Sequence, residues 1–363
     1  MTTADTDTLP KAILYSWPTS VWSTVPQLCL HEKGYSSDEY IVKYVDITKG
    51  ENFAPSYLKI NFNGTIPTLV VPTLETTGND VDTRYRSLKD TISICDFLDH
   101  ARSASSGHIQ HAEKPAPTLA PPLSKVCSPL DQYFTICYVP TGILGKGLSD
   151  EIINLIHVYT VDPNFVAVAA RDEAELRDKA KRPPGKSLAI RREALQRYLE
   201  EARQAVAESA VAPKEGSLTW EQKSVKFLEE KVQSNEQIWE LYNGKAGKEK
   251  EAQFFEVCKR TWTESLPDAF QKLESLFKGP FALGDQISLA DLHTVSWITR
   301  LISIAGGEPD ATGIDSLIPH LGGYRFGPKV RKFWEEWVER ESFKDVLVPA
   351  CGAFKNQGIE DAK

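Results

Sequence analysis

The residues best placed to bind a ligand lie in the segment from Lys49 to Val71, which reads KGENFAPSYLKINFNGTIPTLVV. Near its end, Ile66 precedes Pro67, and a strand-like run begins directly after the proline. A cis peptide bond at Pro67 would turn the backbone of Ile66 outward, so that its N–H and C=O could pair with an extended peptide as an added strand. The alternative is an ordinary trans proline that opens a strand.

The elements around this segment alternate between strand and helix patterns. In chain order they are a strand at Ala12 to Tyr15, a helix at Thr24 to Lys33, a strand at Tyr40 to Val45, a short helix around Pro55 to Ile60, a strand at Thr68 to Val71 and a helix at Asp90 to Leu98. Such alternation predicts a sheet covered by helices, with a right-handed parallel first crossover. The polar stretch from Thr73 to Arg86 is expected to form an extended hairpin. Because the loop before Pro67 also resembles the ligand loop of a thioredoxin-like fold, we expect a thioredoxin-like domain over residues 1–101.

A Pro-rich segment separates this domain from the rest of the chain. Residues 102–123, RSASSGHIQHAEKPAPTLAPPL, favour an extended interdomain linker. From residue 124 to 363 nearly every pattern is helical, because apolar residues recur at spacings of three and four from Phe254 to Phe277 and again from Val330 to Val338. The predicted fold is therefore α/β plus all-α, with an all-helical C-terminal domain.

An insertion in the helical domain is predicted at about residues 161–247. After a charged stretch ending in RPPGK, two amphipathic patterns follow, and the segment VAPKEGS turns the chain between them. They are marked by Leu188, Leu195, Leu199, Ala202 and Val206 in the first and by Val225, Leu228, Val232, Trp239 and Tyr242 in the second. We interpret them as a helical hairpin. Its charges suit a solvated surface, and the alternative is coiled-coil contact with a partner.

Composition narrows the functional classes. The chain has 363 residues, with 42 Lys+Arg against 50 Asp+Glu and a net charge of −8. This balance lacks the cationic excess that neutralises phosphates, so we expect no nucleic-acid partner. No signal peptide and no long apolar run are readable, which predicts a protein without an integral membrane anchor.

The cysteines and histidines predict neither disulfides nor a metal site. Six cysteines are scattered without CxxC spacing, which is typical of a reduced, cytoplasmic protein. Cys29 is expected to be a packed helix residue. His100, His108 and His111 cluster at the linker, but no carboxylate or thiolate completes a ligand set, so we predict no metal.

Three motifs resemble the glutathione S-transferase superfamily. The first is KGE followed by a proline, an aromatic residue, leucine and then Gly-Thr-Ile-Pro-Thr-Leu; the second is Leu88-Lys89-Asp90-Thr91-Ile92; the third is FALGDQISLADL at residues 281–292. The layout of the insertion is also similar to ganglioside-induced differentiation-associated protein and to extended transferase-like proteins of fungi. The animal relatives end in a membrane anchor, whereas the tail VLVPACGAFKNQGIEDAK is short and polar, so we expect no membrane anchoring here.

The resemblance implies a glutathione site. Ile66 and Pro67 would hold the peptide backbone of glutathione, while Asp90 and Thr91 would hold its γ-glutamyl end, the carboxylate pairing with the ammonium. The alternative role of Asp90 and Thr91 is to cap a helix. Where many relatives have His or Lys after KGE, this chain has Asn52-Phe53, and Thr65 replaces a cation or Gln. Lys49, Asn52 and Lys59 are the candidates to substitute.

A serine in the first loop is implied to activate the glutathione thiol. The loop reads YSWPTSVWST from Tyr15 to Thr24, and counting back from Lys33-Gly34 places the family position on Ser20, with Ser23 second and Ser16 third. A hydroxyl and the positive end of a helix would lower the thiol pKa. The alternative is that these serines only cap a helix. No cysteine lies in this loop, which disfavours an omega-like thiol-disulfide oxidoreductase.

Two further pairs complete the predicted site. Trp17 and Trp22 flank the serines and either wall an apolar second-substrate pocket or belong to an ordinary interdomain core. Ser288 and Asp291 have N-cap and N3 spacing and are expected to form a structural helix cap rather than a catalytic pair.

The function implied by the resemblance is that of a cytoplasmic, homodimeric glutathione transferase of detoxification. Glutathione would be the co-substrate, and its thiolate would attack a small hydrophobic or aromatic electrophile by conjugation, ether cleavage or isomerisation. Two alternatives remain. One is a non-catalytic ligand-binding or regulatory protein of the same fold, and the other is an interaction or membrane-associated protein that uses the helical hairpin.

Overall fold

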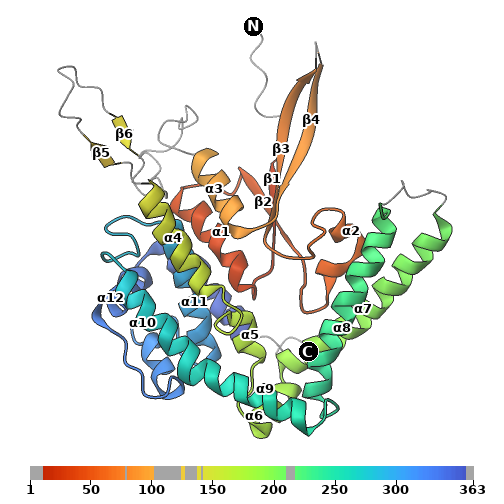
Figure 1. The fold of residues 1–363 in the computed structure, drawn as a ribbon. Helices are drawn as coiled ribbons and strands as arrows, with labels where there is room; N and C mark the ends of the chain where they lie inside the picture. Colours follow the sequence, from red (N-terminus) through yellow and green to blue (C-terminus); the bar gives the residue numbers. More distant parts are fainter. Residues whose placement is uncertain are drawn as a thin grey trace.

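The computed structural model describes residues 11–77, 80–101, 124–126, 137–139, 142–209 and 217–356 (Figure 1). The predicted linker at 102–123 lies outside these ranges. Within them, no helix is long and apolar enough to cross a membrane.

The N-terminal domain is built on a four-stranded mixed sheet. Its strands are β1 (Ala12–Ser16), β2 (Tyr40–Tyr44), β3 (Thr68–Thr77) and β4 (Asp80–Leu88), in the order β2-β1-β3-β4. β1 and β2 are parallel, and the other two pairs are antiparallel. This confirms the thioredoxin-like prediction. β3 is longer than the predicted strand because its polar half pairs with β4 as far as Thr77 and Asp80, and backbone pairing does not require apolar side chains.

Helices cover this sheet and carry the loops of interest. They are α1 (Val21–Glu32), α2 (Pro55–Leu58) and α3 (Thr91–Ala101), with a short 3-10 turn, η2 (Glu51–Phe53), before α2. α1 begins three residues earlier than predicted. Its first turn is rich in β-branched residues, which weakens the helical pattern, but Val21 and Thr24 are buried and packing outweighs propensity there. Cys29 is fully buried, as expected.

The C-terminal part is mostly helical. Its main elements are α4 (Gly142–Ile156), α5 (Pro163–Val168), α6 (Glu173–Lys181), α9 (Lys248–Arg260), α10 (Leu266–Leu276), α11 (Leu289–Ile304), α12 (Pro328–Val338) and α13 (Val348–Asn356). α11 lies at the centre of the core, with Trp297 and Leu301 fully buried.

Two details differ from the predicted helical pattern. A small antiparallel pair, β5 (Ser124–Val126) and β6 (Cys137–Val139), lies in the part predicted to be all-helical. The expected single helix around 254–277 is α9 and α10, joined by the π-helical turn Thr261–Ser265.

The predicted hairpin is present as α7 (Pro183–Glu208) and α8 (Trp220–Tyr242). It stands at one side of the molecule and runs beside α2 (Figure 1). The predicted apolar stripes face inward, since Leu188, Leu195, Leu199 and Leu228 are all buried. The hairpin therefore packs mainly on this chain.

Candidate functional site

Three chain segments meet at one end of the sheet. Tyr15 pairs with Thr68, and Leu69 pairs with Leu88, so the end of β1, the start of β3 and the end of β4 lie together. The loop to α1 leaves from β1 here, and α3 begins shortly after β4. Both helices therefore start beside the first residues of β3, and helix N-termini attract negative charge.

Ile66 lies just before β3 with its backbone polar groups available. The Ile66-Pro67 peptide bond is cis, as the sequence predicts. Pairing with β1 begins only at Thr68, and among the described residues no hydrogen bond reaches the N–H or C=O of Ile66. Buried backbone groups are normally paired, so a half-buried residue with two free groups at a strand start suits an incoming peptide.

The loop before Ile66 is held by side-chain hydrogen bonds. The Asn52 amide donates to the Gly64 carbonyl at 2.7 Å, and the Tyr57 hydroxyl donates to the Thr65 carbonyl at 2.7 Å. Asn61 donates to the same Thr65 carbonyl at 2.9 Å. Burial raises the pKa of Tyr57 to about 12, so it remains a donor at neutral pH. The carbonyls of Gly64 and Thr65 are thus occupied, whereas the carbonyl of Ile66 has no partner among the described residues.

Asp90 and Thr91 both have partners at the start of α3. The Asp90 carboxylate accepts from the Ser93 N–H and the Ser93 hydroxyl, both at 2.8 Å, which is the capping role that the sequence allowed. The Thr91 hydroxyl lies 2.8 Å from Nε2 of His293, whose Nδ1 lies 2.9 Å from the Leu289 carbonyl. Since a carbonyl only accepts, Nδ1 is the protonated nitrogen and Nε2 accepts from Thr91. The Thr91 hydroxyl proton therefore points to the helical domain.

The three candidate serines have different surroundings. Ser20 is the N-cap residue of α1, and among the described residues its hydroxyl has no hydrogen-bond partner. Ser16 is fully buried, and its hydroxyl accepts from the Gln27 amide at 2.8 Å. The Ser23 hydroxyl is buried without a partner. Ser20 thus combines an unoccupied hydroxyl with the positive end of a helix.

Trp17 and Trp22 face different neighbours. Trp17 packs edge-on against Tyr44, with ring centroids 6.0 Å apart. Trp22 stacks on His157, just after α4, at 3.8 Å, and its indole N–H donates to Asp162 at 3.3 Å. Trp22 therefore joins α1 to the helical domain, whereas Trp17 stays within the N-terminal domain.

His157 and His293 are site neighbours that the sequence reasoning did not find. Their rings lie 5.5 Å apart, and burial lowers the pKa of His157 to about 4 and that of His293 to about 3, so both are neutral at pH 7. The Nε2 atom of His157 is buried without a partner. Thr91 and His293 are 202 positions apart, so no local signal could have shown their contact.

The expected substitutes for the missing cationic contacts are engaged elsewhere. Lys49 pairs with Asp46 at 3.2 Å, and the Lys59 ammonium lies 5.6 Å from the centre of the Trp220 ring on α8. Asn52 is buried and its amide holds Gly64.

The predicted cap lies at the start of α11. The Asp291 carboxylate accepts from the Ser288 N–H at 2.8 Å, the Ala282 N–H at 2.7 Å and the Ser288 hydroxyl. Asp291 is fully buried, and its carboxylate fixes the preceding loop, through Ala282 and Ser288, to the start of α11.

The described ranges contain no group of three metal-ligating side chains. His100 contacts the Asp96 carbonyl and carboxylate of its own helix. His108 and His111 lie outside the described residues.

Comparison with known proteins identifies the N-terminal domain. No match is found among curated proteins. Among solved structures, glutathione transferase F7 from Populus trichocarpa is 15% identical, covering 93% of this chain and 99% of its own, at a TM-score of 0.41. Isozyme E7 from Drosophila melanogaster is 13% identical, with 96% of each chain covered and a TM-score of 0.44. Glutathione transferase Omega 3C from Trametes versicolor is 14% identical, covering 94% of this chain and 89% of its own, at a TM-score of 0.41.

Residues 14–106 match the family model described as glutathione S-transferase, N-terminal domain. Residues 14–106, which contain nearly all of the four-stranded sheet, are therefore similar to the N-terminal domain of glutathione S-transferases.

Proposed function

We propose that this protein is a glutathione transferase that activates the thiol of glutathione for attack on an apolar or aromatic electrophile. The observation that carries the proposal is the free backbone of Ile66, which lies at the end of the sheet where α1 and α3 both begin. An extended thiol peptide with an anionic end can pair with this backbone and place its carboxylate at a helix N-terminus.

In this proposal each part of glutathione meets a different element. Its cysteinyl backbone pairs with the N–H and C=O of Ile66, beside Pro67. The γ-glutamyl end lies at the first turn of α3, where the backbone N–H groups receive the carboxylate and Asp90 the ammonium. Because the Thr91 hydroxyl donates to His293, Thr91 contributes its backbone N–H and fixes the helix start.

The Ser20 hydroxyl donates a hydrogen bond to the thiolate sulfur, and the N-terminus of α1 further favours the negative charge. The thiol proton goes to solvent, and the sulfur lone pair forms the new C–S bond as the electrophile loses its leaving group or takes up the electrons. Trp22 and the neutral His157 ring supply an apolar wall for that second substrate. Ether cleavage and isomerisation would use the same thiolate.

The test is the ionisation of bound glutathione, followed by ultraviolet difference titration. Ser20→Ala is expected to raise the pKa of the bound thiol and to lower kcat/KM by about 100-fold, as the loss of one donor to a developing anion typically does. Ser23→Ala, in the first turn of α1, is the matched control, because the Ser23 hydroxyl is also without a partner but is buried. A larger loss of kcat/KM in Ser23→Ala than in Ser20→Ala would assign thiol activation to Ser23. Absence of bound thiolate in the wild type at neutral pH would refute the mechanism.

A second candidate is a non-catalytic ligand-binding or regulatory protein of the same fold. It is favoured by the engagement of Lys49, Asn52 and Lys59 within the chain, which leaves none of these three directed to the glycyl carboxylate of glutathione. Calorimetry combined with the ultraviolet titration distinguishes the two. A non-catalytic protein would release binding heat with glutathione but would show no thiolate absorption.

We further propose that the protein works in the cytoplasm as a homodimer. The cysteines Cys29, Cys95, Cys258 and Cys351 are free and buried, which fits a reducing compartment. Sedimentation equilibrium would test the dimer.

A further inference from the structure

The inserted hairpin covers one side of the loop that leads to Ile66. Leu58 of α2 is buried against Leu195 and Leu228 of the hairpin, while the neighbouring Tyr57 faces the opposite way, toward Tyr15 and Thr68 of the sheet. The short helix α2 is therefore held between the sheet and the hairpin. This contact joins segments that lie more than 130 positions apart in the sequence.

Phe227 of α8 is the hairpin residue that reaches the loop itself. Its ring centroid lies 5.3 Å from that of Phe62 and 6.3 Å from that of Phe53. Gly64 has a positive φ of 62°, and a Cβ there would lie 3.1 Å from Phe227 and 3.0 Å from Phe53. The absence of a side chain at Gly64 thus lets two aromatic rings close on the backbone two residues before Ile66.

Two further hairpin contacts support the same segment. The Arg191 guanidinium donates to the Ile47 carbonyl at 3.2 Å. The alkyl chain of Arg191 passes close to Gly50, where an added Cβ would lie 3.4 Å from Cγ of Arg191. At the other end of the contact, the Lys59 ammonium lies over Trp220. The segment from Ile47 to Gly64 is therefore held by the hairpin at several points.

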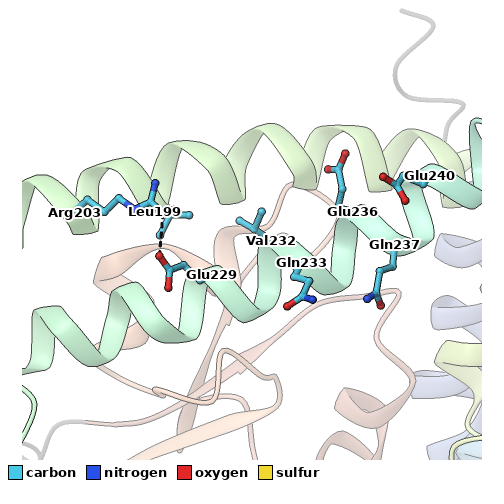
Figure 2. A pocket seen from close by; sticks show the side chains of 8 residues that line it. All are labelled: Leu199, Arg203, Glu229, Val232, Gln233, Glu236, Gln237 and Glu240. Carbon is cyan, nitrogen blue, oxygen red and sulfur yellow. Dashed lines mark hydrogen bonds and ion pairs between the residues drawn. The ribbon is translucent and has the colours of Figure 1, made fainter. Parts of the chain in front are cut away.

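The outer side of the hairpin has a different character. Figure 2 shows a shallow groove between α7 and α8, where polar and acidic side chains surround Leu199 and Val232. Arg203 pairs there with Glu229 at 2.9 Å. The aromatic residues of the contact with the loop do not line this groove.

We propose that Phe227 is a positioning residue for glutathione, and that the inserted hairpin is thereby a structural part of the glutathione site. Phe227 fixes Phe62 and Gly64, and through them it holds the backbone of Ile66 in the conformation that pairs with the peptide. The inference rests on the proposed function, since it concerns the same ligand. It gives the insertion a role in ground-state binding and none in the chemical step.

The test compares Phe227→Ala and Phe227→Leu with Trp239→Leu. Trp239 lies on the same helix, but it packs near the base of the hairpin, with Arg192 and Lys245 over its ring, so it is a matched aromatic control. Phe227→Ala is expected to raise the Kd and the KM for glutathione about tenfold, with kcat at saturation within twofold. Phe227→Leu should show a smaller rise, and Trp239→Leu none, although it lowers Tm. A Kd in Phe227→Ala equal to that of the wild type would overturn the proposal.

Hydrogen exchange of the loop gives a readout that does not depend on glutathione. Faster amide exchange at residues 61–66 in Phe227→Ala than in Trp239→Leu supports positioning by Phe227, and equal rates in the two variants refute it. If the wild type fails to bind glutathione, the proposed function is wrong, and the exchange rates still decide whether the hairpin positions this loop.

Discussion

The N-terminal domain meets the rest of the chain through two surfaces that differ in how many buried hydrogen bonds cross them. On the side of α1 and α3, which we call the polar surface, hydrogen bonds cross a shared apolar core: Thr24 bonds to Ser296 at 2.9 Å, Thr91 to His293 at 2.8 Å, and Trp22 to Asp162 at 3.3 Å. On the side of α2, which we call the apolar surface, the contact is formed mainly by aliphatic and phenyl side chains of the hairpin, with the Arg191 and Lys59 contacts at its edges.

The difference indicates what each surface contributes. Hydrogen bonds are directional and costly to leave unmade, so the polar surface sets the position of α1 and α3, where the proposed thiol and γ-glutamyl sites lie. The free energy of apolar burial depends on the buried area and not on orientation, so the hairpin surface adds stability and packs against the loop before Ile66. The two surfaces should therefore respond differently to truncation and to pH.

The largest expected effect is on the apolar surface. Leu228 is fully buried against Leu58, and Leu228→Ala should lower the free energy of unfolding by about 3 kcal/mol, from lost burial plus the cavity that remains. Urea unfolding followed by circular dichroism measures this. Val232→Ala, which truncates a half-buried neighbour, should cost less than half as much. Equal costs for the two variants would show that the hairpin contact is loosely packed.

The next effect separates the surfaces by pH. Because burial lowers the pKa of His157 to about 4, the unfolded chain takes up this proton first as pH falls below 6.5, and the free energy of unfolding decreases between pH 6.5 and about 4. His157→Phe keeps a ring against Trp22 and removes the titrating group. After discounting for partial exposure, this variant should lose about 2 kcal/mol less than the wild type between pH 7 and pH 4.

Urea unfolding at both pH values gives this comparison. Leu228→Ala is the control, because it should retain the pH dependence of the wild type at a lower stability. If His157→Phe retains the full dependence as well, His157 is not the acid-sensitive group.

The smallest effect is at the edge of the apolar surface. Lys59→Met keeps the alkyl chain and removes the cation over Trp220, so it should cost about 0.5 kcal/mol. Thermal unfolding at low and high salt measures the loss. If the variant instead weakens glutathione binding severalfold at nearly unchanged Tm, Lys59 binds glutathione directly and its contact with Trp220 is secondary.

The local pattern predicted much of the fold. The β-α-β-α-β-β-α order and the helical hairpin followed from short-range periodicity and turn residues, and the cis bond at Pro67 was expected from the likeness of its loop to that of a thioredoxin-like fold. The structure confirms all three. These features depend on residues within about ten positions of one another, which a single sequence displays. The long polar extension of β3 and the early start of α1 were predicted less well, since backbone pairing and burial outweigh residue type there.

The features of the candidate site also fall into those that the sequence shows and those that depend on tertiary packing. By its own spacing the sequence determined which loop holds the serines, which residue precedes the proline and which carboxylate begins α3. Only the tertiary structure decided that the Thr91 hydroxyl donates to His293, that Trp22 stacks on His157, and that Phe227 packs against Gly64. Each of these contacts joins positions more than a hundred residues apart, and their geometry depends on how the helices pack, which no local pattern contains.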